Sequence, residues 1–173
     1  MGVDQANDID ALLPQTQCRR CGFDGCRPYA VALAAGSTAL NRCPPGGEAL
    51  ISRLAALLGR SVLPLDPDRG SAGPPLVALI DETACIGCAR CLDDCPTDAI
   101  LGARRYLHVV LTADCSGCEL CLPPCPVDCI RMVPAPDAGD QTLPWEAIQT
   151  RARRFRSRHE RRQALGARRA LPA

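Results

Sequence analysis

Two cysteine quartets with the same spacing follow one another in the middle of this chain, and they restrict its fold more than any other feature. The segments CIGCARCLDDCPTDAI (residues 85–100) and CSGCELCLPPCPVDCI (residues 115–130) align without gaps and share nine of sixteen positions. Each has the form C-x2-C-x2-C-x3-C-P, and the repeat period is 30 residues. A duplication of this kind predicts two equivalent half-sites related by an approximate two-fold axis.

This spacing is typical of bacterial ferredoxins with two [4Fe–4S] clusters, in which the fourth cysteine of each quartet binds the other cluster. Gly87 and Gly117, each directly before a second cysteine, allow the backbone to approach the cluster closely. We therefore expect one cluster on Cys85, Cys88, Cys91 and Cys125, and the other on Cys95, Cys115, Cys118 and Cys121. Zinc fits less well, because a tetrahedral ion would leave ligands over.

Cys129 is the one cysteine of the repeat that lies outside the quartets, and it aligns with Ala99 of the first copy. A position that holds alanine in one copy is expected to be a small buried site rather than a ligand, since free cysteine packs like a small apolar residue. The alternative interpretation is a reserve ligand or a redox switch.

The segments around the quartets predict a ferredoxin-like domain. Residues 76–81 (LVALID) and 105–112 (RYLHVVLT) have the composition of strands, and short helices are expected at residues 89–95 and 119–125. His108, within the second strand, is expected to be structural. Four aliphatic side chains are candidates to cover the clusters and exclude water: Ile86, Ile100, Val127 and Ile130.

A further cysteine set lies near the N-terminus, at Cys18, Cys21, Cys26 and Cys43, with spacings of x2, x4 and x16. Four thiolates with a single C-x2-C could hold zinc. The long second gap, and Gly25 directly before Cys26, favour an iron–sulfur cluster. Spacing alone leaves both interpretations open.

Breaker residues divide the chain into modules. Residues 1–60 form a first, helical module, with helices expected from Asn7 or Asp8, over CRPYAVALAAG up to Gly36, and over GGEALISRLAALLGR up to Gly59. Residues 61–75 and 135–143 are the predicted linkers. They flank a two-cluster ferredoxin domain at residues 76–134, which precedes an Arg-rich helical tail at residues 144–173. The predicted fold class is α+β.

Composition agrees with a metal framework. Aromatic residues make up 3% of the chain and cysteines number 13, so cysteines take the place of a conventional core. The N-terminal residues contain neither an export signal nor an apolar span, and this predicts a reducing compartment. There, cysteine arrays bind metal rather than form disulfides.

The string LPQTQCRRCGFDGCRPYA (residues 13–30), followed by NRCPPGGE (residues 41–48) and by the repeat ending in CPVDCI, resembles the RnfB/RsxB subunit of Rnf-type electron transport complexes. The resemblance covers about residues 10–134. It implies a [4Fe–4S] cluster on Cys18, Cys21, Cys26 and Cys43, and so three [4Fe–4S] clusters in the chain.

The resemblance also implies redox partners, namely a ferredoxin, a flavoprotein or other Rnf-type subunits. Membrane-bound members of that family carry a hydrophobic N-terminal anchor, whereas here the first module begins almost at Met1. We therefore expect an RnfB-like carrier without that anchor, either cytoplasmic or peripheral on the cytoplasmic face of the inner membrane.

Charge is distributed unevenly along the chain. Residues 1–144 carry 11 Arg against 17 Asp and Glu, and residues 145–173 carry 9 Arg against 2 Glu. A helix from Trp145 would place Ile148, Ala152 and Phe155 on one face. Three interpretations stay open: packing on the chain's own acidic domain, peripheral contact of residues 145–165 with an anionic membrane, and the least favoured, nucleic-acid binding, for which no motif is present.

Electron transfer through the clusters is the function that these features favour, because the sequence contains no catalytic constellation and no nucleotide-binding loop. The chain is therefore expected to be an electron-transfer component of an oxidoreductase or translocase complex, without a substrate site of its own. The alternatives are a ferredoxin-like subunit of a multi-chain reductase and a redox-sensing regulator that uses the tail on nucleic acid.

Overall fold

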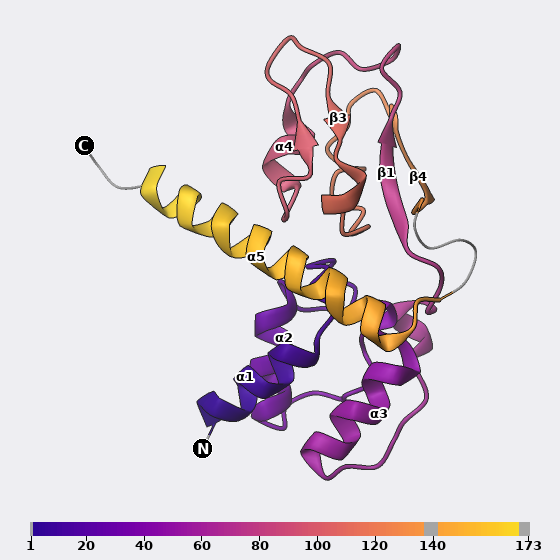
Figure 1. Ribbon diagram of the computed structural model, residues 1–173, viewed down its shortest axis with the longest axis vertical. Helices are drawn as coiled ribbons and strands as arrows, with labels where there is room; N and C mark the ends of the chain where they lie inside the picture. The colour runs from indigo at the N-terminus through magenta and orange to yellow at the C-terminus, as the bar shows by residue number, and fades with distance from the viewer. Residues whose placement is uncertain (1, 137–141, 170–173) are drawn as a thin grey trace. The chain divides into compact units, whose positions relative to one another are not determined.

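Five α-helices and four short strands make up the described residues, 2–136 and 142–169, of the computed structural model. The backbone divides into two units: Met1–Pro75 with Asp140–Ala152, and Leu76–Gly139 with Arg153–Ala173. The first unit is helical, and the second contains the strands (Figure 1). The predicted α+β fold class is confirmed.

The first unit packs α1 (Gly2–Leu12), α2 (Cys26–Ala34) and α3 (Gly47–Leu58) around an aliphatic core. Ile9, Leu33 and Leu54 are completely buried within it. Burying one such side chain stabilises a fold by about 1.5–3 kcal/mol, so leucine and isoleucine replace the missing aromatic residues. Tyr29 is the buried exception, and its hydroxyl donates to the carbonyl of Ala39 at 3.0 Å.

The predicted helix ends at Gly36 and Gly59 are confirmed. Helix α2 ends at Ala34, its C-cap is Ala35, and Gly36 follows directly. Gly59 is the C-cap of α3 and has a left-handed φ of 61°. The predicted start of the first helix was wrong, since α1 already begins at Gly2. Leu57, expected on the apolar face of α3, is 40% exposed, because that face turns through Ile51 and Ala55 instead.

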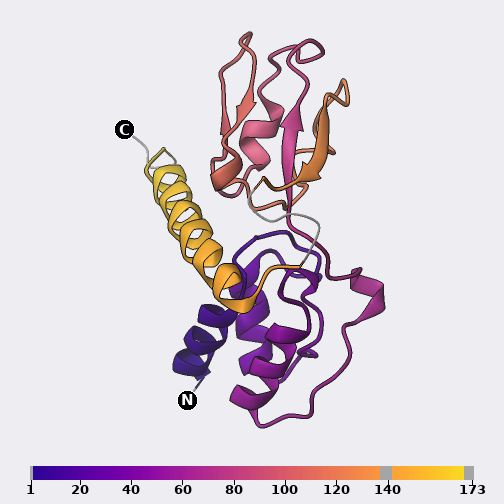
Figure 2. The same ribbon diagram turned by 45° about the vertical axis from the view of Figure 1, so that its right-hand side comes forward.

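The second unit contains two small antiparallel sheets, the short helix α4 (Arg90–Asp94) and the C-terminal part of a longer helix described below. Strand β1 (Leu76–Ile80) pairs with β4 (Ile130–Pro134), and β2 (Ile100–Leu101) pairs with β3 (Val109–Val110). Both views show β1 and β4 side by side, although about fifty residues separate them in the chain (Figures 1 and 2). The strand before the first cysteine quartet therefore pairs with the strand after the second.

Two elements of this unit differ from the sequence prediction. Residues 119–125 form turns rather than a helix, because Pro123 and Pro124 stand where the helical copy has Asp93 and Asp94, and proline lacks the N–H that a helix needs. The predicted strand at 105–112 shrinks to Val109–Val110.

The segment 61–75, predicted as a linker, makes specific contacts within the first unit. The amide of Asn41 donates to the carbonyl of Pro64 at 2.7 Å, and Asp66 pairs with Arg42 and Arg69. Of the second predicted linker, residues 137–141 lie outside the described part of the chain.

The C-terminal helix α5 (Trp145–Arg169) begins within the first unit. The guanidinium of Arg53 lies 4.1 Å from the ring centroid of Trp145, and the amide of Gln149 donates to the carbonyl of Leu12 at 2.9 Å. Over the described residues, no helix has both the length and the apolar character needed to span a membrane.

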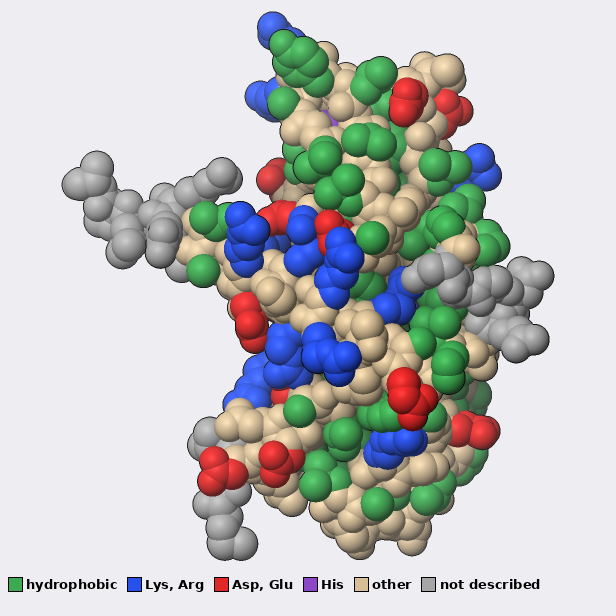
Figure 3. Space-filling model, viewed as in Figure 1, with side chains coloured by type: hydrophobic (Ala, Val, Ile, Leu, Met, Phe, Trp, Pro, Cys, Tyr) green, Lys and Arg blue, Asp and Glu red, His purple; other side chains and the backbone are tan. Residues whose placement is uncertain are grey.

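The remainder of α5 binds the acidic loops of the second unit through three arginines spaced four residues apart. Arg154 and Arg158 contact the carboxylate of Asp114, at 2.5 Å and 3.1 Å, and that side chain is only 5% exposed. Arg158 also donates to the carbonyl of Thr97, and Arg162 pairs with Asp98. Arginine side chains gather where α5 crosses the face seen in Figure 3.

Replacing the buried carboxylate should loosen this part of α5. Asp114→Asn leaves two guanidinium groups without their anionic partner, which is expected to cost about 1–3 kcal/mol. Amide hydrogen exchange in residues 153–166 should accelerate accordingly.

Asp93→Asn is the matched control, because Arg162 contacts the backbone carbonyl of Asp93 and not its side chain. This control should stay within about 0.5 kcal/mol of the wild type. Equal exchange rates in the two variants would show that the carboxylate of Asp114 does not hold the helix.

Candidate metal centre

Three cavities in this chain are lined by cysteine side chains, five in the first and four in each of the other two. Cavity A encloses about 280 Å³, cavity B about 320 Å³ and cavity C about 290 Å³, part of each being open to solvent. Cavity A is lined by Cys85, Cys88, Cys91, Cys125 and Cys129, cavity B by Cys95, Cys115, Cys118 and Cys121, and cavity C by Cys18, Cys21, Cys26 and Cys43. Among the described residues, no three His, Cys, Asp or Glu side chains converge on a single-ion position.

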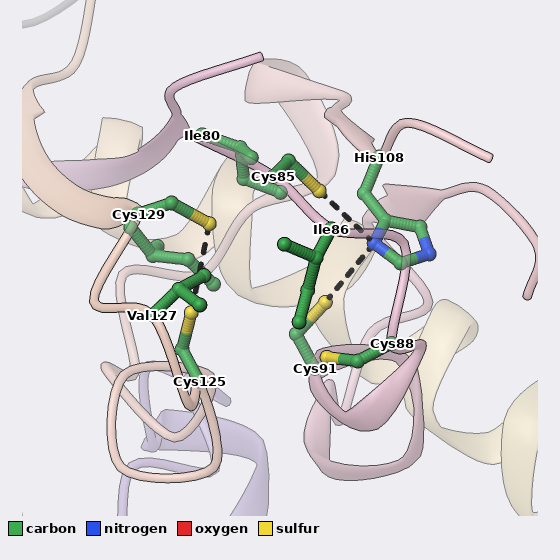
Figure 4. A pocket seen from close by; sticks show the side chains of 10 residues that line it. Ile80, Cys85, Ile86, Cys88, Cys91, His108, Cys125, Val127 and Cys129 are labelled. Atoms are coloured by element: carbon green, nitrogen blue, oxygen red, sulfur yellow. Dashed lines mark hydrogen bonds between the residues drawn. The ribbon is translucent and has the colours of Figure 1, made fainter. Parts of the chain in front are cut away.

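One cysteine of each quartet lines the cavity of the other repeat. Cys125 lines cavity A together with three cysteines of the first copy and with its own neighbour Cys129, and Cys95 lines cavity B (Figure 4 shows cavity A). The exchange follows from local structure, because α4 carries Cys91 and ends directly before Cys95, where the backbone becomes extended. A single turn of helix therefore connects Cys91 of cavity A to Cys95 of cavity B.

The loops around cavities A and B need glycine directly before their second cysteine. Gly87 and Gly117 both have a φ of 68°. A Cβ on Gly117 would lie 2.4 Å from the carbonyl oxygen of Leu76, and one on Gly87 would lie 2.8 Å from that of Tyr106. Both loops thus lie directly against neighbouring backbone.

Backbone N–H groups point at cysteine sulfurs in cavity B. The N–H of Ala78 donates to Cys115 Sγ at 3.4 Å, and that of Ala99 donates to Cys95 Sγ at 3.2 Å. Donors placed at a thiolate stabilise its negative charge, which a ligand of an iron–sulfur cluster requires.

The structure distinguishes Cys125 from Cys129, whose sulfurs lie 3.5 Å apart. Burial raises the pKa of the Cys125 thiol, but the backbone N–H groups of Val127 and Cys129 outweigh it and hold that pKa below its ordinary value. Burial and the neighbouring Cys125 raise the pKa of Cys129 to about 12. The backbone N–H groups around Cys125 thus favour its thiolate form.

Cavity C is supported by two glutamines that cysteine spacing does not reveal. Gln17 Oε1 accepts the N–H of Cys26 at 2.9 Å, and its amide nitrogen donates to Gln15 at 2.9 Å. Gln15 in turn donates to the backbone carbonyl of Asp10 at 2.7 Å. Buried glutamine is rare, and nothing in LPQTQC marked these two side chains as buried.

The buried thiols fit a positively charged metal group. Burial raises the pKa of Cys26 and of Cys121 to about 12, and it raises that of Cys43 well above its ordinary value. Without a metal these side chains would keep their protons at neutral pH. Binding of iron would displace those protons, and the positive charge of the metal would balance the negative charge of four thiolates.

The side chains expected to cover the clusters do line the cavities, but unequally. Ile86 and Val127 lie on cavity A and remain 61% and 40% exposed, whereas Ile130, on cavity A, and Ile100, on cavity B, are buried. His108, expected to be structural, also lines cavity A, where its ring faces two of the five cysteines (Figure 4).

Comparison with known proteins gives two family matches. A family described as "4Fe-4S dicluster domain" matches residues 78–132, and one described as "Putative Fe-S cluster" matches residues 13–45. These two ranges contain the cysteines of cavities A and B and of cavity C, respectively. No solved structure matches the chain.

Curated relatives match over most of the chain. The B subunit of the ion-translocating oxidoreductase complex of Alkalilimnicola ehrlichii is 63% identical over 130 residues, which span 75% of this chain and 70% of that relative. Its counterpart from Hahella chejuensis is 57% identical over 144 residues, covering 83% and 71%. The counterpart from Azoarcus is 54% identical over 145 residues, covering 84% and 79%.

Adding a methyl group at Gly117 should disrupt cavity B. Gly117→Ala introduces both an unfavourable left-handed backbone and a contact with the Leu76 carbonyl, so the expected cost is about 3 kcal/mol or more. The melting temperature of the second unit, followed by circular dichroism under anaerobic conditions, should fall clearly.

Gly59→Ala separates the two causes. Gly59 has a φ of 61°, but nothing lies within 4 Å of the position that a Cβ would take, so this variant bears only the backbone cost of about 1–2 kcal/mol. If both variants lost the same stability, close approach at Gly117 would not be what the loop requires.

Proposed function

Because the chain belongs to the family of B subunits of ion-translocating oxidoreductase complexes, the Rnf-type family that its sequence resembles, we propose that it carries electrons through [4Fe–4S] clusters in its cysteine-lined cavities. The observation that carries this proposal is the exchange of Cys95 and Cys125 between cavities A and B. Two sites that share their ligating segments in this way form a two-cluster electron carrier.

Three clusters are proposed, one for each cavity. The ligands are Cys85, Cys88, Cys91 and Cys125 in cavity A, and the four lining cysteines in each of cavities B and C. The alternative for cavity C is zinc, which draws its four sulfurs to about 2.3 Å from a single point. The four cysteines of cavity C all lie within residues 13–45, which match a family described as "Putative Fe-S cluster". This match supports an iron–sulfur cluster rather than zinc in cavity C.

The chain's own residues prepare the sites for electron transfer. A bound [4Fe–4S] cluster supplies a centre that takes up and releases one electron at a time. The N–H groups of Ala78 and Ala99 stabilise negative charge at cavity B, and Val127 and Cys129 do so at Cys125 in cavity A. The buried Ile100 and Ile130 limit the access of water.

The proposed partners are redox proteins: other subunits of a complex of this type, and a ferredoxin or flavoprotein that exchanges electrons with it. The names of the relatives place those proteins in an ion-translocating oxidoreductase complex. For this chain we propose a position at the cytoplasmic face of the inner membrane. Direct membrane contact through residues 145–165 is supported by the arginine content of α5, although Arg154, Arg158 and Arg162 already bind the second unit.

Paired cysteine variants test the ligand sets. Cys125→Ala and Cys91→Ala come from different repeats but line the same cavity. Both should remove about one third of the iron and abolish the same component of the EPR spectrum of the reduced protein. Cys95→Ala and Cys121→Ala should share the loss of a different component.

Cys129→Ala is the control within the same cavity, because alanine already occupies the equivalent position 99. It should retain all of the iron and the full spectrum. A Cys125→Ala spectrum that matched Cys121→Ala would refute the exchange of ligands. The intact protein should also pass electrons to a ferredoxin or flavoprotein after reduction, which a structural zinc protein would not do.

A further inference from the structure

Cavities A and B, although related by the repeat, differ at one pair of facing positions. The 30-residue period extends upstream of the cysteines, so that residues 76–80 align with residues 106–110 and Ala78 corresponds to His108. By the same period Gly102 corresponds to Met132. Cavity B therefore has the small Ala78 at the first position and the large Met132 at the second. At cavity A the first position holds the large His108, and the second, beside it, holds Gly102.

The two pairs fill comparable space with different chemistry. At cavity B, Ala78 and Met132 are register partners on β1 and β4, and both line the cavity. At cavity A, a Cβ on Gly102 would lie 1.8 Å from the ring of His108, so the imidazole occupies the space that glycine leaves. A thioether is only a weak acceptor, whereas an imidazole can donate a proton in a hydrogen bond.

The ring of His108 is oriented toward the cysteines. It is 1% exposed, and its Nδ1 lies 3.7 Å from Cys85 Sγ and 3.8 Å from Cys91 Sγ (Figure 4). Ligating thiolates only accept hydrogen bonds, so Nδ1 must carry the proton. Nε2 is buried and has no hydrogen-bond partner among the described residues, so no acceptor there competes for that proton.

We propose that His108 donates its Nδ1–H to the sulfurs of Cys85 and Cys91 and thereby makes the cluster of cavity A easier to reduce than it would be without the imidazole. This inference rests on the proposed function, since it requires a cluster in cavity A. A hydrogen bond to a ligating sulfur stabilises the more negative, one-electron-reduced state and so raises the reduction potential. At cavity B, Ala78 and Met132 supply no side-chain donor in the corresponding place.

The consequence is a difference between two sites that the duplication would otherwise make equivalent. His108 biases an electron shared by cavities A and B toward cavity A. The device involves a single side chain and the glycine that makes room for it, and neither residue is a ligand.

The hydrogen bond can be detected in the unmodified sequence. The chain has only two histidines, His108 and His159, so protein labelled with ¹⁵N-histidine gives an assignable spectrum. Pulsed EPR of the reduced protein should show nitrogen coupling to one cluster. His159→Gln should retain the coupling and His108→Leu should abolish it, whereas the absence of coupling in the labelled wild type would overturn the proposal.

Redox titration followed by EPR then measures the effect on that cluster. In His108→Leu, which keeps bulk without a donor, the ratio of reduced to oxidised cluster at a fixed potential should fall about tenfold, equivalent to about 59 mV for one electron. His108→Asn places an amide N–H near the same position and should restore most of the ratio. Met132→Leu, the matched change at cavity B, should leave the cavity A midpoint unchanged.

Gly102→Ala provides an independent test, because the added methyl displaces the ring without removing it. It should lower the same midpoint as His108→Leu and leave the other two in place. Unchanged midpoints in His108→Leu, with full iron content, would overturn this inference alone. An iron content in the wild type that left cavity A empty would overturn the proposed function together with it.

Discussion

The exchange of one cysteine between two repeats is the constraint on which the second unit depends. Cys95 and Cys125 each line the cavity formed by the other copy, so neither copy alone supplies the four ligands proposed for its cavity. The secondary structure that accompanies them is slight, with two small sheets and one five-residue helix. Since ligation releases protons and orders the chain at the same time, metal binding supplies stability that so small a core would not provide.

The two copies of the repeat have the same cysteine spacing, but the residues around the cysteines differ. Four substitutions between the copies surround the exchange: Pro123 and Pro124 convert a helix to turns, Cys129 replaces Ala99, and His108 replaces Ala78. Helix α5 adds a further difference, because its arginines bind Asp114, next to Cys115, and the loop after Cys95. Both of those segments belong to cavity B, so the two sites have different surroundings despite the equal ligand sets proposed for them.

Much of this arrangement could be predicted from the sequence, because cysteine spacing reports directly on ligand geometry. The repeat predicted strand β1, helix α4 and the α+β class, and glycines marked the ends of α2 and α3. Side-chain direction could not be predicted in this way. His108 was expected to be structural, since a single histidine in a strand carries no signal of what it faces, and the glutamines behind Cys26 have no spacing rule. The arginines of α5 showed a charge pattern but not their partners.

The central claim is that all three cavities hold four-iron clusters, and metal analysis of protein purified under anaerobic conditions tests it most directly. Iron, acid-labile sulfide and zinc should be measured together on the same sample and divided by the protein concentration from amino-acid analysis. We expect about 12 iron and about 12 sulfide per chain, without stoichiometric zinc. About eight iron with one zinc would contradict the claim at cavity C, and about four iron would mean that only one of the three cavities holds a four-iron cluster.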